Sequence, residues 1–106
     1  MATEISRVTL FRVLKEDDRP IVLAEFKKMQ KNALKDGKQY ITSVKAGQVV
    51  EDPRTQGYTV ALQTTFATLE DMNFFDTECK FHTELKKVVG PRMIPPPVVV
   101  YFNNVV

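Results

Sequence analysis

Apolar and polar side chains alternate most regularly in residues 58–66. One set of alternate positions is core-like, and the set between them is small or semi-polar. The core-like set consists of Tyr58, Val60, Leu62, Thr64 and Phe66. Strict alternation indicates a half-buried strand, because successive side chains of a strand point to opposite faces. The pattern therefore predicts a strand with one core-facing side.

Other segments also have strand character. Residues 5–13 alternate and are rich in β-branched side chains, and residues 40–50 form another predicted strand. The prolines at 95–97 exclude a helix and bring the chain in extended form into residues 98–102. That last segment is apolar at every position, so we expect both of its faces to be covered.

Helical periodicity appears first in residues 20–36, and Gly37 is placed to end this helix as a left-handed cap. Its apolar stripe is formed by Val22, Phe26, Met29 and Ala33. Thr68 is the expected N-cap of a second helix, with Asp71 three residues later. A third helical segment carries His82 on one face and ends near Gly90.

We predict a single α+β domain that spans residues 1–106. The order of its elements is βαββα(α)β, the ferredoxin-like arrangement with a four-stranded antiparallel sheet. The helices can cover only one face of that sheet. The other face carries Val8, Leu10 and one side of residues 98–102. A large apolar patch is rarely left exposed on a monomer. We therefore expect a homodimer in which two open sheet faces pack together and close a dimeric α+β barrel.

Composition narrows the possible partners. The chain has 106 residues, 43% of them hydrophobic and 26% charged, with a net charge of +2. That charge is too small to indicate binding of nucleic acid or of a membrane surface. The N-terminus lacks a signal-peptide core, and no apolar stretch approaches a membrane-spanning length. One cysteine excludes an internal disulfide, so we expect a reducing, cytoplasmic location.

The candidate chemistry is concentrated in residues 74–85, which contain both the sole histidine, His82, and the sole cysteine, Cys79. Histidine is the side chain best suited to acid/base chemistry near neutral pH. The alternative is that His82 is half exposed and packs against the core. Cys79 is either a nucleophile or a small buried hydrophobe. One cysteine and one histidine cannot complete a zinc site, and we expect neither metal nor cofactor.

Several segments of the sequence are similar to segments of one protein family, and they occur in the same order along the chain. Residues 7–12, Arg-Val-Thr-Leu-Phe-Arg, are similar to a His-Ile-Val-Leu-Phe-Lys opening strand, and residues 57–66 are similar to the third strand of the same family. Phe74-Phe75 leading to His82 is similar to a Tyr-Tyr to Asp-Pro-x-His stretch. By these segments the chain resembles the stress-responsive A/B barrel domain, the dimeric α+β barrel family known as Dabb, over nearly its whole length.

The resemblance implies a cavity between helices and sheet, and a distant likeness to polyketide cyclases of the olivetolic acid cyclase type. In those cyclases the histidine matching His82 is a base in a cofactor-free aldol condensation, with a tyrosine as its partner. Here Phe75 stands near the tyrosine position, and Arg7 replaces a first-strand histidine. Tyr40, Tyr58 and Tyr101 are possible replacement hydroxyls. Arg7 is a possible partner for a carboxylate or oxyanion, or else forms an ion pair at the cavity mouth.

Two classes of function remain open. The first is a cofactor-independent cyclase or lyase acting on a small polyketide-like or aromatic carbonyl compound, with His82 as general base. A cofactor-free monooxygenase is a variant of that class. The second is a non-catalytic, stress-associated module that binds an apolar molecule or a partner. The side chains expected to line the cavity are Phe11, Phe26, Met29, Val60, Leu62, Phe75, Phe81, Leu85 and Val100.

Overall fold

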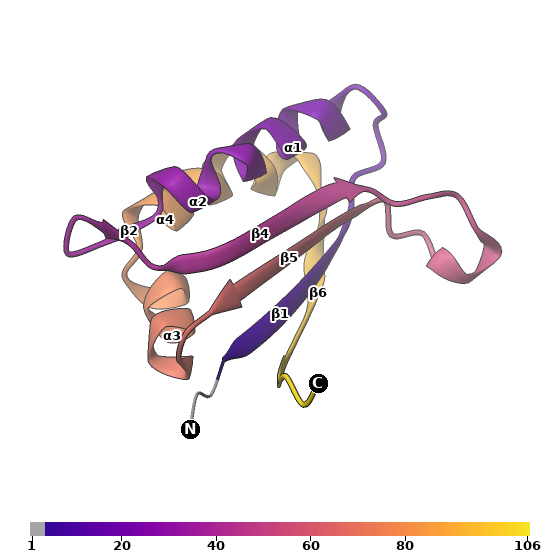
Figure 1. Cartoon of the computed structure of the whole chain (residues 1–106). Helices are drawn as coiled ribbons and strands as arrows, with labels where there is room; N and C mark the ends of the chain where they lie inside the picture. The colour runs from indigo at the N-terminus through magenta and orange to yellow at the C-terminus, as the bar shows by residue number, and fades with distance from the viewer. Residues whose placement is uncertain (1–3) are drawn as a thin grey trace.

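Four strands form one antiparallel sheet in a computed structural model that describes residues 4–106 (Figure 1). Their order across the sheet is β4-β5-β1-β6, so the first and third long strands lie in the middle. Their bounds are Ile5–Arg12 for β1, Ile41–Gln48 for β4, Val60–Phe66 for β5 and Ile94–Asn103 for β6. The predicted α+β, ferredoxin-like fold with a four-stranded antiparallel sheet is confirmed.

The helices lie over one side of this sheet (Figure 1). They are α1 (Asp18–Lys27), α2 (Met29–Asn32), α3 (Leu69–Thr77) and α4 (Lys80–Val89), and short 3₁₀ turns lie at Pro53–Thr55 and Gly90–Arg92. Thr68 begins α3 as predicted, since its hydroxyl oxygen accepts a hydrogen bond from the Asp71 amide at 3.1 Å.

The predicted helix over residues 20–36 is confirmed as far as Asn32 and is wrong over residues 33–36. The helix breaks into α1 and α2, and Ala33 is already extended with ψ of 108°. A two-stranded hairpin follows, with β2 at Leu34–Lys35 and β3 at Lys38–Gln39. Asp36 and Gly37 both have positive φ, at 52° and 76°. Two such residues between paired strands form the turn that favours Asp-Gly, so Gly37 turns a hairpin instead of capping a helix.

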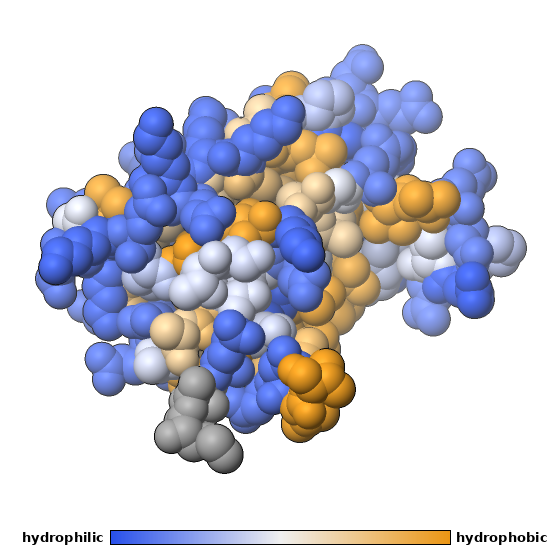
Figure 2. Space-filling model, viewed as in Figure 1, coloured by the Kyte–Doolittle hydropathy of each residue, from blue (hydrophilic) through white to orange (hydrophobic). Residues whose placement is uncertain are grey.

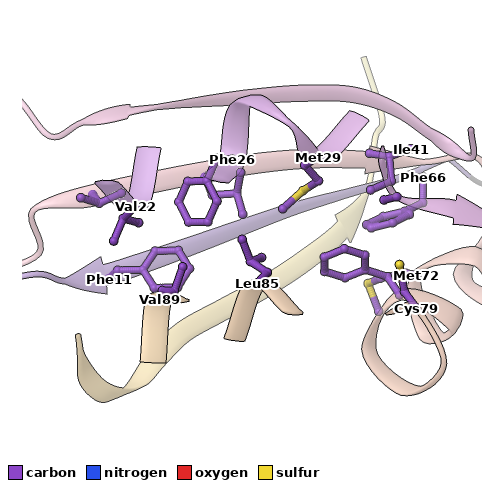
Figure 3. Close-up of a cluster of buried hydrophobic side chains, with 14 of the residues drawn as sticks. Phe11, Val22, Phe26, Met29, Ile41, Phe66, Met72, Cys79, Leu85 and Val89 are labelled. Atoms are coloured by element: carbon purple, nitrogen blue, oxygen red, sulfur yellow. The ribbon is translucent and has the colours of Figure 1, made fainter. Parts of the chain in front are cut away.

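The core lies between the helices and the sheet. In Figure 3, Phe26 and Met29 point from α1 and α2 toward Phe11 of β1 and Leu85 of α4. The alternation predicted in residues 58–66 is present, because every second residue of β5 from Val60 to Phe66 is buried. Burying a side chain the size of Phe26 or Met29 contributes about 1.5–3 kcal/mol to folding.

The opposite face of the sheet is open. Val8 pairs with Val100 and Leu10 pairs with Val98, so these side chains share that face. Val100 and Phe102 are 53% and 50% exposed. Figure 2 shows hydrophobic side chains gathered beside hydrophilic ones around the C-terminal end of the chain. The strand at residues 98–102 is therefore not covered on both sides within one chain.

Candidate functional site

A cavity of about 280 Å³ opens between the sheet, α1 and α4. Most of its lining is apolar, with a few polar groups inserted. The lining residues are Arg7, Thr9, Phe11, Phe26, Met29, Leu62, Thr64, Phe75, His82, Leu85, Lys86, Val89, Gly90, Met93, Pro95, Pro97 and Val99. A largely apolar cavity with a few placed polar groups is the ordinary form of a small-molecule site.

His82 is held in one orientation at this cavity. Its Nδ1 lies 2.8 Å from the carbonyl oxygen of Phe75, and its ring stacks on the Phe75 ring at 4.0 Å between centroids and 13° between planes. A carbonyl oxygen only accepts hydrogen bonds, so Nδ1 carries the proton of the neutral ring. Nε2 therefore keeps its lone pair, and residues 4–106 provide it with no hydrogen-bond partner. This is the tautomer that a general base needs.

The end of α3 explains why Phe75 offers that oxygen. The last four carbonyls of a helix have no partner within the helix, and α3 ends at Thr77. The carbonyl of Phe74 accepts hydrogen bonds from the amides of Glu78 and Cys79 at 2.9 and 3.0 Å. The next carbonyl, that of Phe75, accepts from the side chain of His82 in the first turn of α4.

Burial lowers the pKa of His82 below its ordinary value of 6.5. The hydrogen bond to Phe75 and the negative charge of Asp76 act in the opposite direction, while the positive charges of Lys86 and Arg7 add to the lowering of this pKa. The side chain is 15% exposed. His82 is therefore neutral, and its Nε2 able to accept a proton, at pH 7.

Arg7 lines the cavity from β1, on the same side of the strand as Thr9 and Phe11. Its Nη1 contacts both carboxylate oxygens of Asp76 at 2.8 Å, and the two side chains are 10% and 38% exposed. The guanidinium carbon also lies 5.8 Å from the centre of the Phe75 ring. Asp76 Oδ1 is 3.9 Å from Nδ1 of His82. The Asp76 carboxylate thus lies next to both Arg7 and His82.

The structure brings most of the predicted cavity residues together, but not all. Phe11, Phe26, Met29, Leu62, Phe75 and Leu85 line the cavity with His82 and Arg7. Val60 is fully buried in the core, and Phe81 lines a separate depression beside Leu34 and Phe74. Val100 lies on the open face, because its pairing with Val8 directs it away from the helices.

The tyrosines considered as hydroxyl partners lie elsewhere. The Tyr40 ring packs edge-on against Phe74 at 5.3 Å, and its buried hydroxyl finds no hydrogen-bond partner in residues 4–106. Burial and the neighbouring Cys79 raise the pKa of Tyr40 far above its ordinary value. The Tyr58 ring stacks with the Arg12 guanidinium at 4.0 Å. Tyr101 of β6 is 53% exposed, and none of the three tyrosines lines the cavity.

Several lining residues had not been expected. Thr9 and Thr64 are polar positions on the cavity side of neighbouring strands, and the alternation of those strands could have identified both. Lys86 follows His82 by one helical turn, so it shares the same face of α4. Asp76 is 69 residues from Arg7 in sequence. No local pattern could have indicated that pair.

The described residues contain no group of three or more His, Cys, Asp or Glu side chains placed to hold a metal ion. Cys79 is buried. None of the helices within residues 4–106 has the length and apolar character needed to cross a membrane.

Comparison with known proteins identifies relatives of this chain. The chain is 39% identical over 103 residues to the Fusaristatin A biosynthesis cluster protein of Gibberella zeae, covering 97% of this chain and 75% of that protein.

Two solved structures share the fold. One is the hydroxynitrile lyase from Passiflora edulis, with a TM-score of 0.75 and 20% identity over 98% of this chain and 95% of that chain. The other is a dimeric protein of unknown function with a ferredoxin-like fold from Bacteroides fragilis. It has a TM-score of 0.72 and 18% identity over 96% and 97% of the two chains. Residues 5–94 match the stress responsive A/B barrel domain. The chain belongs to the stress-responsive A/B barrel (Dabb) family.

Proposed function

We propose that this protein is a cofactor-independent acid/base enzyme of the cyclase or lyase type, acting on a small polyketide-like or aromatic carbonyl compound. His82 is its general base. The Nε2 atom removes a proton from the carbon next to the substrate carbonyl, which leaves an enolate and an imidazolium. The enolate then attacks a second carbonyl or expels a leaving group, and Nε2 returns the proton.

The observation that carries this proposal is the tautomer of His82. The 2.8 Å hydrogen bond from Nδ1 to Phe75 leaves Nε2 as the basic atom in an apolar cavity. A histidine that served only to cap α3 would need this hydrogen bond but no cavity beside its ring. The lowered pKa of His82 favours the neutral base at the working pH.

Arg7 supplies the positive charge for the developing enolate. Its side chain is 10% exposed, and a preorganised cation in a poorly hydrated site stabilises developing negative charge more than one in water. Thr9 and Thr64 replace the missing tyrosines as hydroxyl groups at the cavity wall. They can donate hydrogen bonds to a substrate oxygen.

The relatives agree with small-molecule chemistry. The similar protein of Gibberella zeae belongs by its name to a biosynthesis cluster, which favours a role in natural-product formation. The Passiflora edulis neighbour is a lyase on the same fold. Fold is a weak guide to reaction, so the residues at the cavity carry the argument.

We further propose that two copies pack through their open sheet faces. The exposed Val100 and Phe102 form the apolar patch that such a dimer would cover. The Bacteroides fragilis neighbour is described as dimeric.

The catalytic proposal can be tested without the natural substrate. The probe is 1-phenyl-1,3-butanedione in D₂O, whose acidic protons exchange for deuterium when a base removes them. We expect the protein to accelerate this exchange, as followed by proton NMR, and His82→Gln to reduce the acceleration about a hundred- to ten-thousand-fold. Glutamine can still donate to the Phe75 carbonyl, so the end of α3 stays capped.

Glu84→Gln is the matched control, since Glu84 lies on the same helix and pairs with Lys87 at the exposed surface. It should leave the exchange rate unchanged. Equal rates for the wild-type protein and His82→Gln would instead support the non-catalytic, ligand-binding function, with His82 as a cap for α3.

A further inference from the structure

The charged groups of the cavity all carry the same sign. Arg7 and Lys86 line it, and no carboxylate does so among the residues described. Asp76 contacts Arg7 but does not itself line the cavity. An apolar cavity that presents cations and no anions is complementary to an apolar molecule bearing a negative charge.

Lys86 is the cation available to such a ligand. Within residues 4–106 no carboxylate lies within 4.0 Å of its ammonium group, whereas the neighbouring Lys87 pairs with Glu84 at 2.8 Å. Lys86 is exposed, unlike Arg7, which places it where the cavity meets solvent. The positive charge of Lys86 also acts on the cavity side of α4, because it is one of the causes that lower the pKa of His82.

Arg7 uses only some of its hydrogen-bond donors in its contact with Asp76. Asp76 occupies Nη1, while Nε and Nη2 make no hydrogen bond within the described part of the chain. A guanidinium has five N–H donors, so donors remain for a ligand oxygen deeper in the cavity. The two cations are therefore placed to contact different parts of a ligand. Lys86 can contact a negative charge at the cavity mouth, and Arg7 can contact a carbonyl or enolate oxygen deeper in the cavity.

The volume of the cavity limits the size of the apolar part of the ligand. An apolar cavity of about 150 Å³ can hold a benzene molecule. The 280 Å³ available here is enough for an aromatic ring with a short side arm. Phe11, Phe26 and Met29 supply apolar contacts for that ring.

We propose that the ligand is a carboxylic acid with an apolar body, and that Lys86 binds its carboxylate at the cavity mouth. This names the substrate class of the enzyme proposed above and rests on that function only in using the same cavity. Lys86 is then a specificity-determining residue, which selects the acid over neutral compounds of the same shape.

The test compares 3-phenylpropionate with 3-phenylpropionamide, which has nearly the same shape and no charge. Dissociation constants come from NMR shift titrations, with the Met29 and Met93 methyl signals reporting on the cavity. We expect the acid to bind about tenfold more tightly than the amide, with the preference falling as salt is raised.

Lys86→Gln should abolish this preference and leave the affinity for the amide unchanged. Lys87→Gln is the matched control, since it removes the same charge one residue along and should keep the preference. Lys86→Gln should also raise the pKa of His82, because the charge of Lys86 is one of the causes that lower it, whereas Lys87→Gln should leave it unchanged. The charged groups around His82 are Lys86, Asp76 and Arg7, and only the first is altered.

Equal affinities for acid and amide, an acid preference that survives Lys86→Gln, or no binding of either compound at millimolar concentration would each overturn the proposal. Its failure is distinguishable from failure of the catalytic function. Acid binding through Lys86 with no proton exchange above background would leave a binding protein. Exchange catalysis without acid preference would leave an enzyme for neutral substrates.

Discussion

The two faces of the central sheet use the same strands for different purposes. On the helix side, Met29 from α2 packs onto the sheet with 0% of its surface exposed. On the open side, Val100 of β6 is 53% exposed although it is also apolar. Arg7, a charged residue, lies on the covered side.

This contrast teaches that hydropathy alone does not identify the functional face. Arg7 can lie on the covered face because Asp76 pairs with its guanidinium. The other donors of Arg7 have room in the cavity that its side chain lines. The open face gathers apolar side chains in the absence of any helix of residues 4–106 to cover them. This difference is the reason for proposing that the first face binds a small molecule and that the second binds another copy of the chain.

The largest expected effect comes from placing a charge on the open face. Val100→Asp would put a carboxylate into the proposed dimer interface twice, once from each copy. An unpaired charge buried in an apolar interface costs several kcal/mol. We expect a monomer by analytical ultracentrifugation at micromolar concentration, where the wild-type protein sediments as a dimer.

Val50→Asp is the control for this change, since Val50 is 84% exposed after the end of β4 and lies outside the sheet. It should remain dimeric. A wild-type protein that sediments as one chain would refute the dimer.

A truncation on the covered face should be costly to folding. Met29→Ala removes a fully buried side chain, and such changes lower the free energy of unfolding by about 2–5 kcal/mol. The comparison on the open face is Phe102→Ser, which removes a half-exposed apolar side chain and should cost much less.

Both truncations are made in the Val100→Asp variant, so that dissociation of a dimer does not contribute to the measured free energy. Urea denaturation at one protein concentration then gives the two losses. Equal losses would show that the open face is already covered within one chain.

The Arg7–Asp76 pair should contribute less than the core and more than a surface pair. Asp76→Asn removes the negative partner of a nearly buried cation, at a cost of about 1–3 kcal/mol in the free energy of unfolding. It should also lower the pKa of His82 further, because the charge of Asp76 raises that pKa. Glu84→Gln breaks an exposed pair and should change stability far less. Similar losses for the two variants would mean that the buried pair is not special.

The smallest effect concerns the dependence of stability on pH. The pKa of His82 is lower in the folded chain than in the unfolded chain, where it is near 6.5. Below pH 6.5 the unfolded chain therefore binds a proton that the folded chain does not, so stability falls as the pH is lowered from 6.5 through the folded pKa. His82→Gln should flatten this part of the stability curve. An unchanged slope would show that other groups cause it.

The sequence predicts the covered face better than the open one. Residues 58–66 alternate cleanly, so the buried side of β5 could be assigned. Alternation in residues 5–13 puts Arg7 on the same side as Phe11, but it leaves open whether Arg7 points into the cavity or forms an ion pair at its mouth. Residues 98–102 are apolar at every position, so alternation carries no information about which side chains face the helices. Only pairing with β1 decides that Val100 faces outward.

The remaining differences have similar causes. The sequence does not indicate the hairpin after α2, because Ala33 and Leu34 continue the helical stripe and a glycine at position 37 also fits a helix C-cap. The position of Tyr40 depends on the irregular pairing between Ile41 and Ser43, which shifts the register of β4.

Asp76 depends on tertiary packing between distant segments, because 69 residues separate it from Arg7. The sequence thus identified His82, Arg7 and most of the apolar cavity residues as candidates, but not the charged neighbours Asp76 and Lys86.

The state of the His82 ring is the most direct test of its assignment as the general base. His82 is the sole histidine, so its ¹⁵N signals can be assigned without ambiguity in a labelled sample. A pH titration by long-range ¹H–¹⁵N NMR should give a pKa below 6.5 and, above it, a neutral ring protonated on Nδ1 with a free Nε2. A pKa above 6.5, or a neutral ring protonated on Nε2, would contradict the assignment.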